Sequence, residues 1–317
     1  MILTVPQTLL LTASLWLIPI GPMAQETPNN ILILLSDNDD VYLDVATTIT
    51  NTTIKYCRNH QLACQNSNFD IVQISSYDSQ SARNNQLVIT LGIQAALFTQ
   101  KHFPDTPTIS ALIPKHSKAI ENSAQNNPSQ FYLFLDQPIE RSLLLIKALS
   151  ERFKNIGVLV LRQDFQDQTR ISELAKTLQL NLHTGRVDSM ETIGKSLSQI
   201  LDDIDIFLAL PESNIHNKTT VSYILLSTYR KRIPLIGFSS AYVKAGALAA
   251  VYSSPQDIAD QVRDNVVDYL KRGSLPKFQQ MDDYFSVLFN TDVARSLGFP
   301  TKSETRLKKI IMELEPQ

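Results

Sequence analysis

Polar and aromatic side chains follow two short apolar runs in the second half of the sequence, at 204–210 and 234–238. Together these segments supply a carboxylate, an amide, several hydroxyls and two aromatic rings. The candidate ligand-binding residues are Pro211, Glu212, Ser213, Asn214, Phe238, Ser239, Ser240 and Tyr242. This mixture suits a small zwitterion or an aromatic or heterocyclic metabolite, and it does not suit a polyphosphate. Phe238 continues its apolar run directly, so a place in the core is an equal alternative for this residue.

A second candidate set follows the apolar runs of the first half. Ser36 comes after the run 31–35 and could donate to a ligand, whereas the acids at 37–40 are expected to cap a helix. Another helix opens after the run 87–91, and its free N–H groups could hold a ligand carboxylate. The residues of this helix start are Gly92, Ile93, Gln94 and Ala95, and Gly92 could instead only make the turn. Asp136 could pair with a ligand ammonium or form a polar turn with Gln137 before Pro138.

The sequence offers little support for catalysis or for a bound cofactor. No nucleophile elbow or metal-binding motif is present, and the five histidines are scattered. Only His216 falls in a loop after an apolar run, and we expect it to be exposed at a helix start. The nine glycines are widely spaced, which excludes the phosphate-cradling loops of nucleotide-binding proteins. We therefore predict no catalytic residues, no metal site and no cofactor.

Composition and the first residues indicate an exported protein. The 317 residues carry a formal net charge of -2, so no basic field favours nucleic acid. Residues 1–24 have no charged side chain and contain an apolar stretch, which is typical of a signal peptide. A retained membrane anchor is the alternative, although its prolines and polar residues weaken it as a membrane helix. We expect a periplasmic, monomeric protein.

The two cysteines, Cys57 and Cys64, lie seven positions apart. On one continuous helix their axial separation would be about 10 Å, too far for a disulfide bond. A bridge therefore requires the helix to end between them, near 59–61. We favour this disulfide over two reduced thiols for an exported chain.

Short apolar runs alternate with segments of helical periodicity along the chain, which predicts an α/β fold with parallel sheets. The predicted strands are 31–35, 69–74, 87–91, 108–113, 131–135, 156–161, 181–187, 204–210, 234–238, 248–252 and 285–289. The principal helices are predicted at 40–58, 139–153, 166–178, 190–201, 217–230 and 255–272. Eleven strands are more than one doubly wound sheet usually holds, so two lobes are expected.

Three crossings between the lobes are expected where proline or polar residues interrupt the pattern, at 136–138, 252–255 and 279–283. We assign 29–136 and 254–317 to the first lobe and 137–253 to the second. Lobes built from discontinuous segments would meet at a hinge and enclose a cleft.

Segments 238–248, 269–273 and 290–298 resemble the ABC-transporter substrate-binding proteins of the tryptophan/tyrosine-binding type. Supporting matches lie at 91–95, 135–138 and 208–211, so the resemblance covers nearly the whole mature chain. It implies a type I periplasmic-binding-protein fold with a small ligand held between two lobes. Gly246 lies in the matching segment and joins the candidate binding residues. We expect substitution of Gly92 or Gly246 to damage binding rather than folding.

The resemblance implies an exported solute-binding protein that captures an amino-acid-like or aromatic ligand and presents it to a membrane permease. Two departures leave the ligand and the permease open. The chain has no cysteine for lipid attachment after its apolar start, and the segment 211–214 is less polar than in characterised relatives. A ligand-sensing accessory module for a membrane receptor is the alternative function, and an enzyme is the least supported.

Overall fold

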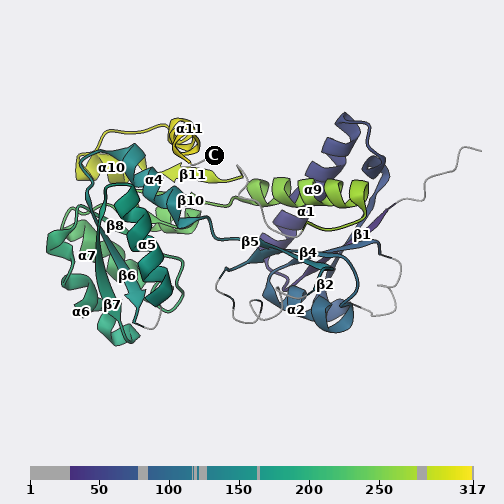
Figure 1. Ribbon diagram of the computed structural model, residues 1–317, viewed down its shortest axis with the longest axis horizontal. Helices are drawn as coiled ribbons and strands as arrows, with labels where there is room; N and C mark the ends of the chain where they lie inside the picture. Colours follow the sequence, from purple (N-terminus) through teal and green to yellow (C-terminus); the bar gives the residue numbers. More distant parts are fainter. Residues whose placement is uncertain are drawn as a thin grey trace, which may run out of the picture.

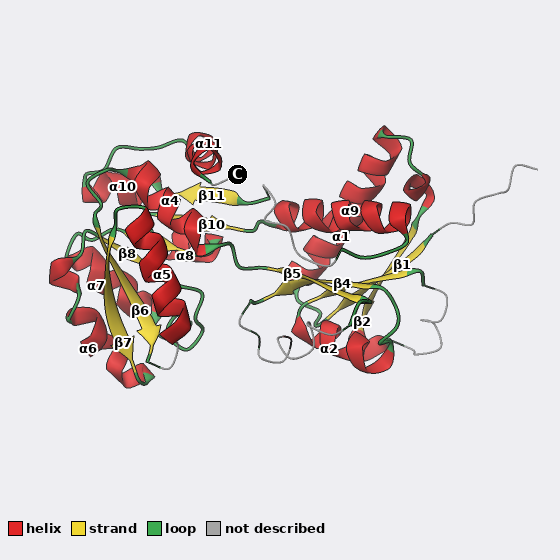
Figure 2. Ribbon diagram, viewed as in Figure 1, coloured by secondary structure: helices red, strands yellow, loops and turns green. Residues whose placement is uncertain are grey.

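The computed structural model describes residues 29–77, 85–115, 117, 120, 127–162, 165–276 and 284–315. These residues form two α/β lobes that lie side by side (Figure 1). Each lobe has a central sheet with helices on both faces, as Figure 2 shows by its colours. The predicted α/β fold with two parallel-sheet lobes is confirmed, and each of the eleven apolar runs coincides with a strand.

The first lobe contains a five-stranded sheet in the order β2-β1-β3-β4-β5, and all of its neighbouring strands are parallel. Its strands are β1 (Asn30–Leu35), β2 (Asn68–Gln73), β3 (Leu87–Leu91), β4 (Thr108–Ile113) and β5 (Gln130–Phe134). Alternate residues of β1 point to opposite faces, and both faces are covered, so β1 is apolar from Ile31 to Leu35. Helices α1 (Asp40–Asn59) and α9 (Pro255–Arg272) cover one face together, and α2 (Ile93–His102) lies on the other (Figure 1).

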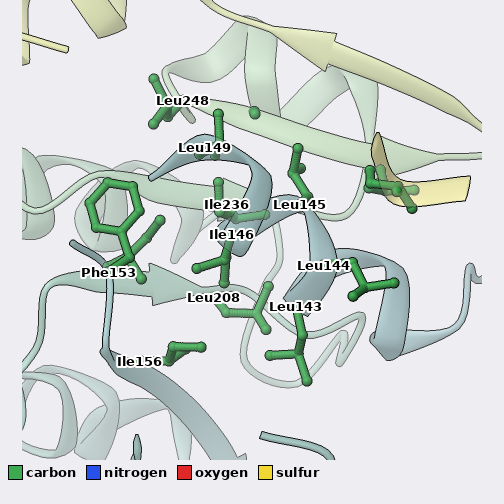
Figure 3. Packing of buried hydrophobic residues seen from close by; sticks show 14 of the residues in the cluster. Leu143, Leu144, Leu145, Ile146, Leu149, Phe153, Ile156, Leu208, Ile236 and Leu248 are labelled. Carbon is green, nitrogen blue, oxygen red and sulfur yellow. The ribbon is translucent and has the colours of Figure 1, made fainter. Parts of the chain in front are cut away.

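The second lobe contains a six-stranded sheet in the order β11-β10-β9-β8-β6-β7. Its strands are β6 (Asn155–Leu161), β7 (Asn181–Val187), β8 (Ile206–Leu208), β9 (Leu235–Gly237), β10 (Ala249–Tyr252) and β11 (Ser286–Phe289). Its helices are α4 (Ile139–Leu149), α5 (Phe165–Thr177), α6 (Ile193–Ser198), α7 (Val221–Arg230), α8 (Ser240–Ala245), α10 (Thr291–Leu297) and α11 (Glu304–Leu314). The largest apolar cluster packs α4 and α11 against one face of this sheet (Figure 3). A second cluster packs α6, α7 and α8 against the other face.

The end of the chain belongs to the second lobe, which differs from the division expected from the sequence. Strand β11 pairs antiparallel with β10 along four residue pairs, and Phe285 and Phe289 enter the core of this lobe. Helix α11 packs on α4 and β11. The predicted crossing at 279–283 lies outside the described residues, yet the strand after it joins the second sheet. Among the described residues of the segment 254–317, α9 and Leu275 just after it pack on the first lobe.

One side chain ties the three lobe connections together. Gln137 Nε2 donates to Ser253 Oγ at 2.8 Å and to the Tyr284 carbonyl at 3.3 Å. Ser253 Oγ in turn donates to the Leu135 carbonyl at 2.8 Å. Arg141 donates to Gln137 Oε1 at 2.7 Å, is only 2% exposed and pairs with Glu315. The hinge is therefore a hydrogen-bonded unit in which Gln137, on the first crossing, contacts Ser253 of the second and Tyr284, the first described residue after the third.

Cys57 and Cys64 are joined in a disulfide bond, with Cα atoms 5.6 Å apart. Helix α1 ends at Asn59, and Gln61 adopts a positive φ of 52° immediately afterwards. This turn brings Cys64 back beneath the end of the helix, as the expected bridge requires. The bond is buried against Val267 of α9.

The predicted signal segment 1–24 lies outside the described residues. Among the residues that the structure describes, no helix has both the length and the apolar character needed to cross a membrane.

Candidate functional site

The candidate ligand residues other than Gly246 gather at the carboxyl edges of the two sheets. Strand β5 of the first lobe ends at Phe134 and leads directly into α4 of the second lobe. Strand β10 of the second lobe ends at Tyr252 and leads into α9 of the first. Because both crossings leave from carboxyl ends of parallel strands, both of these edges lie next to the hinge. Ligands of open α/β sheets bind at such edges.

The edge of the first lobe is built around Gly92, which precedes α2 with a φ of 90°. Gly92 has no side chain that could cap the helix, so the capping group comes from another segment of the chain. Ser36 Oγ, directly after β1, accepts a hydrogen bond from the Ala95 N–H at 2.9 Å. Within the described residues the N–H groups of Ile93 and Gln94 donate to no protein group. The helix therefore presents two N–H donors at its positive end.

Tyr42 of α1 also reaches this edge, and the sequence analysis missed it. A Cβ atom on Gly92 would lie 2.6 Å from Ser36 Oγ and 2.8 Å from the Tyr42 hydroxyl. Burial, together with the carboxylates of Asp39 and Asp37, raises the pKa of the Tyr42 hydroxyl above its ordinary value. The group therefore stays protonated and can donate. Tyr42 is the third residue of a predicted helix that starts close to a strand end, and this position could have identified it from the sequence.

The acids after β1 cap helix α1, as predicted, whereas Gln137 forms its side-chain hydrogen bonds within the hinge. Asp39 is the N-cap of α1 and accepts from the Val41 N–H at 3.2 Å. All the amide atoms of Gln137 are used within the hinge. Asp136 Oδ2 accepts from the Lys115 N–H at 2.6 Å, which fixes the carboxylate at the carboxyl edge of the first lobe.

The loops of the second edge are shaped by local hydrogen bonds. Glu212 Oε1 accepts from both the backbone and the side chain of Asn214 at 2.9 Å, which closes the turn after β8. Ser239 is the N-cap of α8 and accepts from the Tyr242 N–H at 3.2 Å. Gly246 ends the same helix with a φ of 127° and lies just before the start of β10, so the structure places it toward the amino edge, away from the other candidate residues. Ser213 is exposed, whereas Pro211 and Ser240 are partly buried.

Four rings form a cluster at this second edge, which we call the His216 cluster: Phe207, His216, Phe238 and Tyr242. The His216 ring centroid lies 6.4, 6.0 and 5.8 Å from those of Phe207, Phe238 and Tyr242, each in an edge-to-face arrangement. Phe238 and Tyr242 also meet edge to face at 5.4 Å. Phe238 is only partly buried, so it is both a member of the cluster and accessible at the edge.

His216 was expected to be exposed, and this expectation is wrong because the side chain is only 6% exposed. His216 Nδ1 shares a 2.9 Å hydrogen bond with the Tyr242 hydroxyl, while Nε2 is buried with no partner among the described groups. Burial lowers the pKa of His216 to about 4 and raises that of Tyr242. Both side chains are therefore neutral at pH 7.

No group of three or more potential metal ligands occurs among the described residues. The groups at the two edges are hydrogen-bond donors and acceptors, carboxylates and aromatic rings.

A family model described as ABC transporter substrate binding protein matches residues 38–308. The chain belongs to this family. The resemblance inferred from the sequence is thereby confirmed, and solute binding is the family's activity. The search of curated proteins found no match.

Solved structures show the same fold in other substrate-binding proteins. An ABC domain from Streptococcus pneumoniae in complex with L-Trp is 20% identical, covering 89% of this chain and 98% of its own, with a TM-score of 0.55. The ligand-free, open form of a substrate-binding protein with adhesive properties from Clostridium difficile is 15% identical, covering 87% and 96%, with a TM-score of 0.68. A periplasmic ribose ABC transporter protein from Conexibacter woesei is 10% identical, covering 88% and 97%, with a TM-score of 0.51.

Proposed function

We propose that this substrate-binding protein is exported, captures an amino-acid-like or aromatic solute between its lobes and delivers it to an ABC-type permease. The observation that carries the proposal is the placement of two chemically different edges beside one hinge. The first edge offers the N–H groups of Ile93 and Gln94, and the second offers the rings of the His216 cluster. A small molecule with a carboxylate at one end and a ring at the other satisfies both.

The carboxylate of such a ligand would bind at the start of α2. Two N–H donors at a helix N-terminus favour an anion, and the hydroxyls of Ser36 and Tyr42 lie next to them. The carboxylate of Asp136, at the same edge of the first lobe, would pair with an ammonium group. This arrangement favours a zwitterion over a simple carboxylate.

The rest of the ligand would contact the second lobe. Phe238 supplies an accessible ring, and aromatic pairs are worth about 0.5–1.5 kcal/mol beyond the area that they bury. The partly buried Ser240 and the exposed Ser213 supply hydroxyls for polar substituents of the ligand. An L-Trp complex in a structure of the same fold makes aromatic amino acids the first compounds to test.

Closure follows from binding to both lobes. A ligand that contacts both edges stabilises the closed arrangement by the free energy of the second set of contacts. The hinge can accommodate this motion because its three connections are held by hydrogen bonds through Gln137 and Ser253 rather than by a large apolar interface.

Thermal unfolding of the mature chain with panels of amino acids, aromatic compounds, nucleosides and organic acids tests the proposal. A ligand at one hundred times its Kd stabilises by about 2.7 kcal/mol, which raises the Tm by roughly 5 °C for a protein of this size. Small-angle scattering should then show a more compact particle. If no compound raises the Tm and the scattering stays unchanged, solute capture is rejected.

Single substitutions then test the location of the site. Ser36→Ala and Ser240→Ala should weaken the ligand because each removes a hydroxyl that the proposal places against it, and neither should unfold the chain because neither side chain is in the core. Gln199→Ala, an exposed residue at the end of α6, is the matched control and should leave the affinity unchanged. Unchanged affinity in both site variants would contradict the assignment of these two edges.

A further inference from the structure

A surface cavity of about 370 Å³ lies in the second lobe, away from the edges described above. It is lined by Leu149 at the end of α4, Leu248 just before β10 and Phe289 at the end of β11. Leu248 precedes β10 and Tyr252 ends it, so the cavity lies at the amino edge of the parallel strands. The hinge and the candidate solute site lie at the carboxyl edge, so the two sites are at opposite ends of the sheet.

The walls of this cavity belong to the largest apolar cluster of the protein. Figure 3 shows Leu149, Phe153 and Leu248 together at one end of that cluster. Leu248 is 1% exposed and Phe153 is 4% exposed, so the cavity reaches the core. Phe299 completes the wall, with its ring centroid 5.4 Å from that of Phe153. Protein interiors are close-packed, and a cavity of this volume falls within the range of small-molecule sites.

Two basic residues line the cavity, Arg152 and Lys302. Neither forms an ion pair within the part of the chain that the structure describes. Basic residues elsewhere in the same lobe do form such pairs, for example Arg162 with Asp188, Arg170 with Glu140 and Lys231 with Asp202. The cavity therefore combines apolar walls with two cations that lack a carboxylate partner.

The negative charges near the cavity lie outside its lining. The C-terminal ends of α4 and α10 lie here, and each contributes about half a negative charge, which is less than the two full positive charges. The nearest acids do not line the cavity. Glu304 Oε1 accepts from the Phe289 N–H at 2.9 Å, and Glu151 is exposed beside Arg152. Within the lining itself, Arg152 and Lys302 are therefore the only formally charged residues.

We propose that this cavity binds a small carboxylate with a flat apolar tail, such as an aryl carboxylate, independently of the solute site between the lobes. The ring would pack against Phe153, Phe299 and Leu248, and the carboxylate would lie between Arg152 and Lys302. An amine of the same shape is disfavoured because its charge would face two cations.

The test uses three probes of equal shape: phenylacetate, 2-phenylethanol and 2-phenylethylamine. Amide NMR spectra of the ¹⁵N-labelled mature chain are recorded during titration with each probe. We expect phenylacetate to shift the signals of 149–153 and 298–302, the alcohol to bind more weakly and the amine most weakly. Equal binding of all three probes would overturn the proposal. So would shifts centred on 92–95 and 238–242, because the probe would then occupy the solute site.

Charge-removing variants complete the test. Arg152→Gln and Lys302→Gln should each weaken phenylacetate about two- to fivefold, the range for partly exposed ion pairs, and the double variant about tenfold. Arg230→Gln and Lys195→Gln, exposed in α7 and α6, are the matched controls and should change nothing. Undiminished affinity in the double variant would overturn the proposal, whether or not the protein captures a solute between its lobes.

Discussion

The two lobes present their ligand edges by different means, although their sheets share the same parallel design. In the first lobe the edge consists of backbone around Gly92, closed in by two hydroxyls from other elements. In the second lobe the edge consists of side-chain rings around a buried histidine. One edge thus suits charge and hydrogen bonding and the other suits an apolar ring. Neither edge alone offers both the N–H donors of a helix start and the rings of the His216 cluster, so a ligand that needs both must draw the lobes together.

The two lobes also differ in how a serine caps the helix at the ligand edge. Ser239 caps the helix that it begins, three residues before its donor Tyr242. Ser36 caps α2 from a different strand, 59 positions away from its donor Ala95. The first arrangement is local, whereas the second couples β1 to α2. Changes at the first edge should therefore disturb two elements, and changes at the second edge only one.

The largest expected effect concerns the buried histidine of the second edge. The pKa of His216 is about 4 in the folded protein and about 6.5 in the unfolded chain, so the folded state takes up its proton only at lower pH. The stabilisation is complete above about pH 6.5 and is lost as the pH falls through 4. The shift corresponds to about 3 kcal/mol. Chemical denaturation followed by circular dichroism between pH 7 and pH 4 measures this loss.

His216→Phe retains a ring without a titratable group, so the loss of stability between pH 7 and pH 4 should be about 3 kcal/mol smaller in this variant. His102→Gln, an exposed histidine of the first lobe, is the control and should keep the full pH dependence. An identical pH dependence for His216→Phe and the native chain would show that the ring cluster does not exclude the proton. The second edge would then be open to water, as the first is.

The next effect concerns the backbone of the first edge. Gly92→Ala forces a side chain into a φ of 90° and a ψ of 167°, a region that only glycine tolerates, at a cost of about 2 kcal/mol. The new Cβ also meets Ser36 Oγ and the Tyr42 hydroxyl. Gly273→Ala is the control, because its φ is 70° but no atom lies within 4 Å, and it should cost about 1 kcal/mol. Unfolding free energies from urea titration compare the two.

If Gly92→Ala costs no more than Gly273→Ala, the hydroxyls move aside freely and the first edge is not rigid. The comparison also bears on the expectation that Gly92 matters for binding rather than folding. The positive φ gives Gly92 a folding role as well. Gly246 has a positive φ at the end of α8 and open space around it, so its folding role is that of a helix C-cap.

Periodicity predicted the strands because neighbouring residues such as Ile31 and Leu32 are buried on opposite faces of a parallel sheet, which leaves a continuous apolar run. It could not assign β11 to the second sheet, because antiparallel pairing with β10 depends on partners 34 to 40 positions earlier in the sequence and not on local pattern. The candidate site divides in the same way. Local features such as the Asp39 cap were predictable, whereas the burial of His216 depends on Phe207, Phe238 and Tyr242, which lie far apart in sequence.

The smallest expected effect compares the two capping serines. Ser36→Ala and Ser239→Ala each remove one acceptor from a helix start, and each should cost about 1 kcal/mol in the free energy of unfolding.

The two substitutions differ in their coupling to Gly92. Removing Ser36 Oγ also removes the atom closest to an added Cβ, at 2.6 Å, so the Gly92→Ala/Ser36→Ala double variant should be less destabilised than the sum of the single variants. Gly92→Ala/Ser239→Ala should be additive, because these residues lie in different lobes. A double-mutant cycle by urea denaturation measures both sums, and equal additivity in the two pairs would show that the first edge is no more tightly coupled than the second.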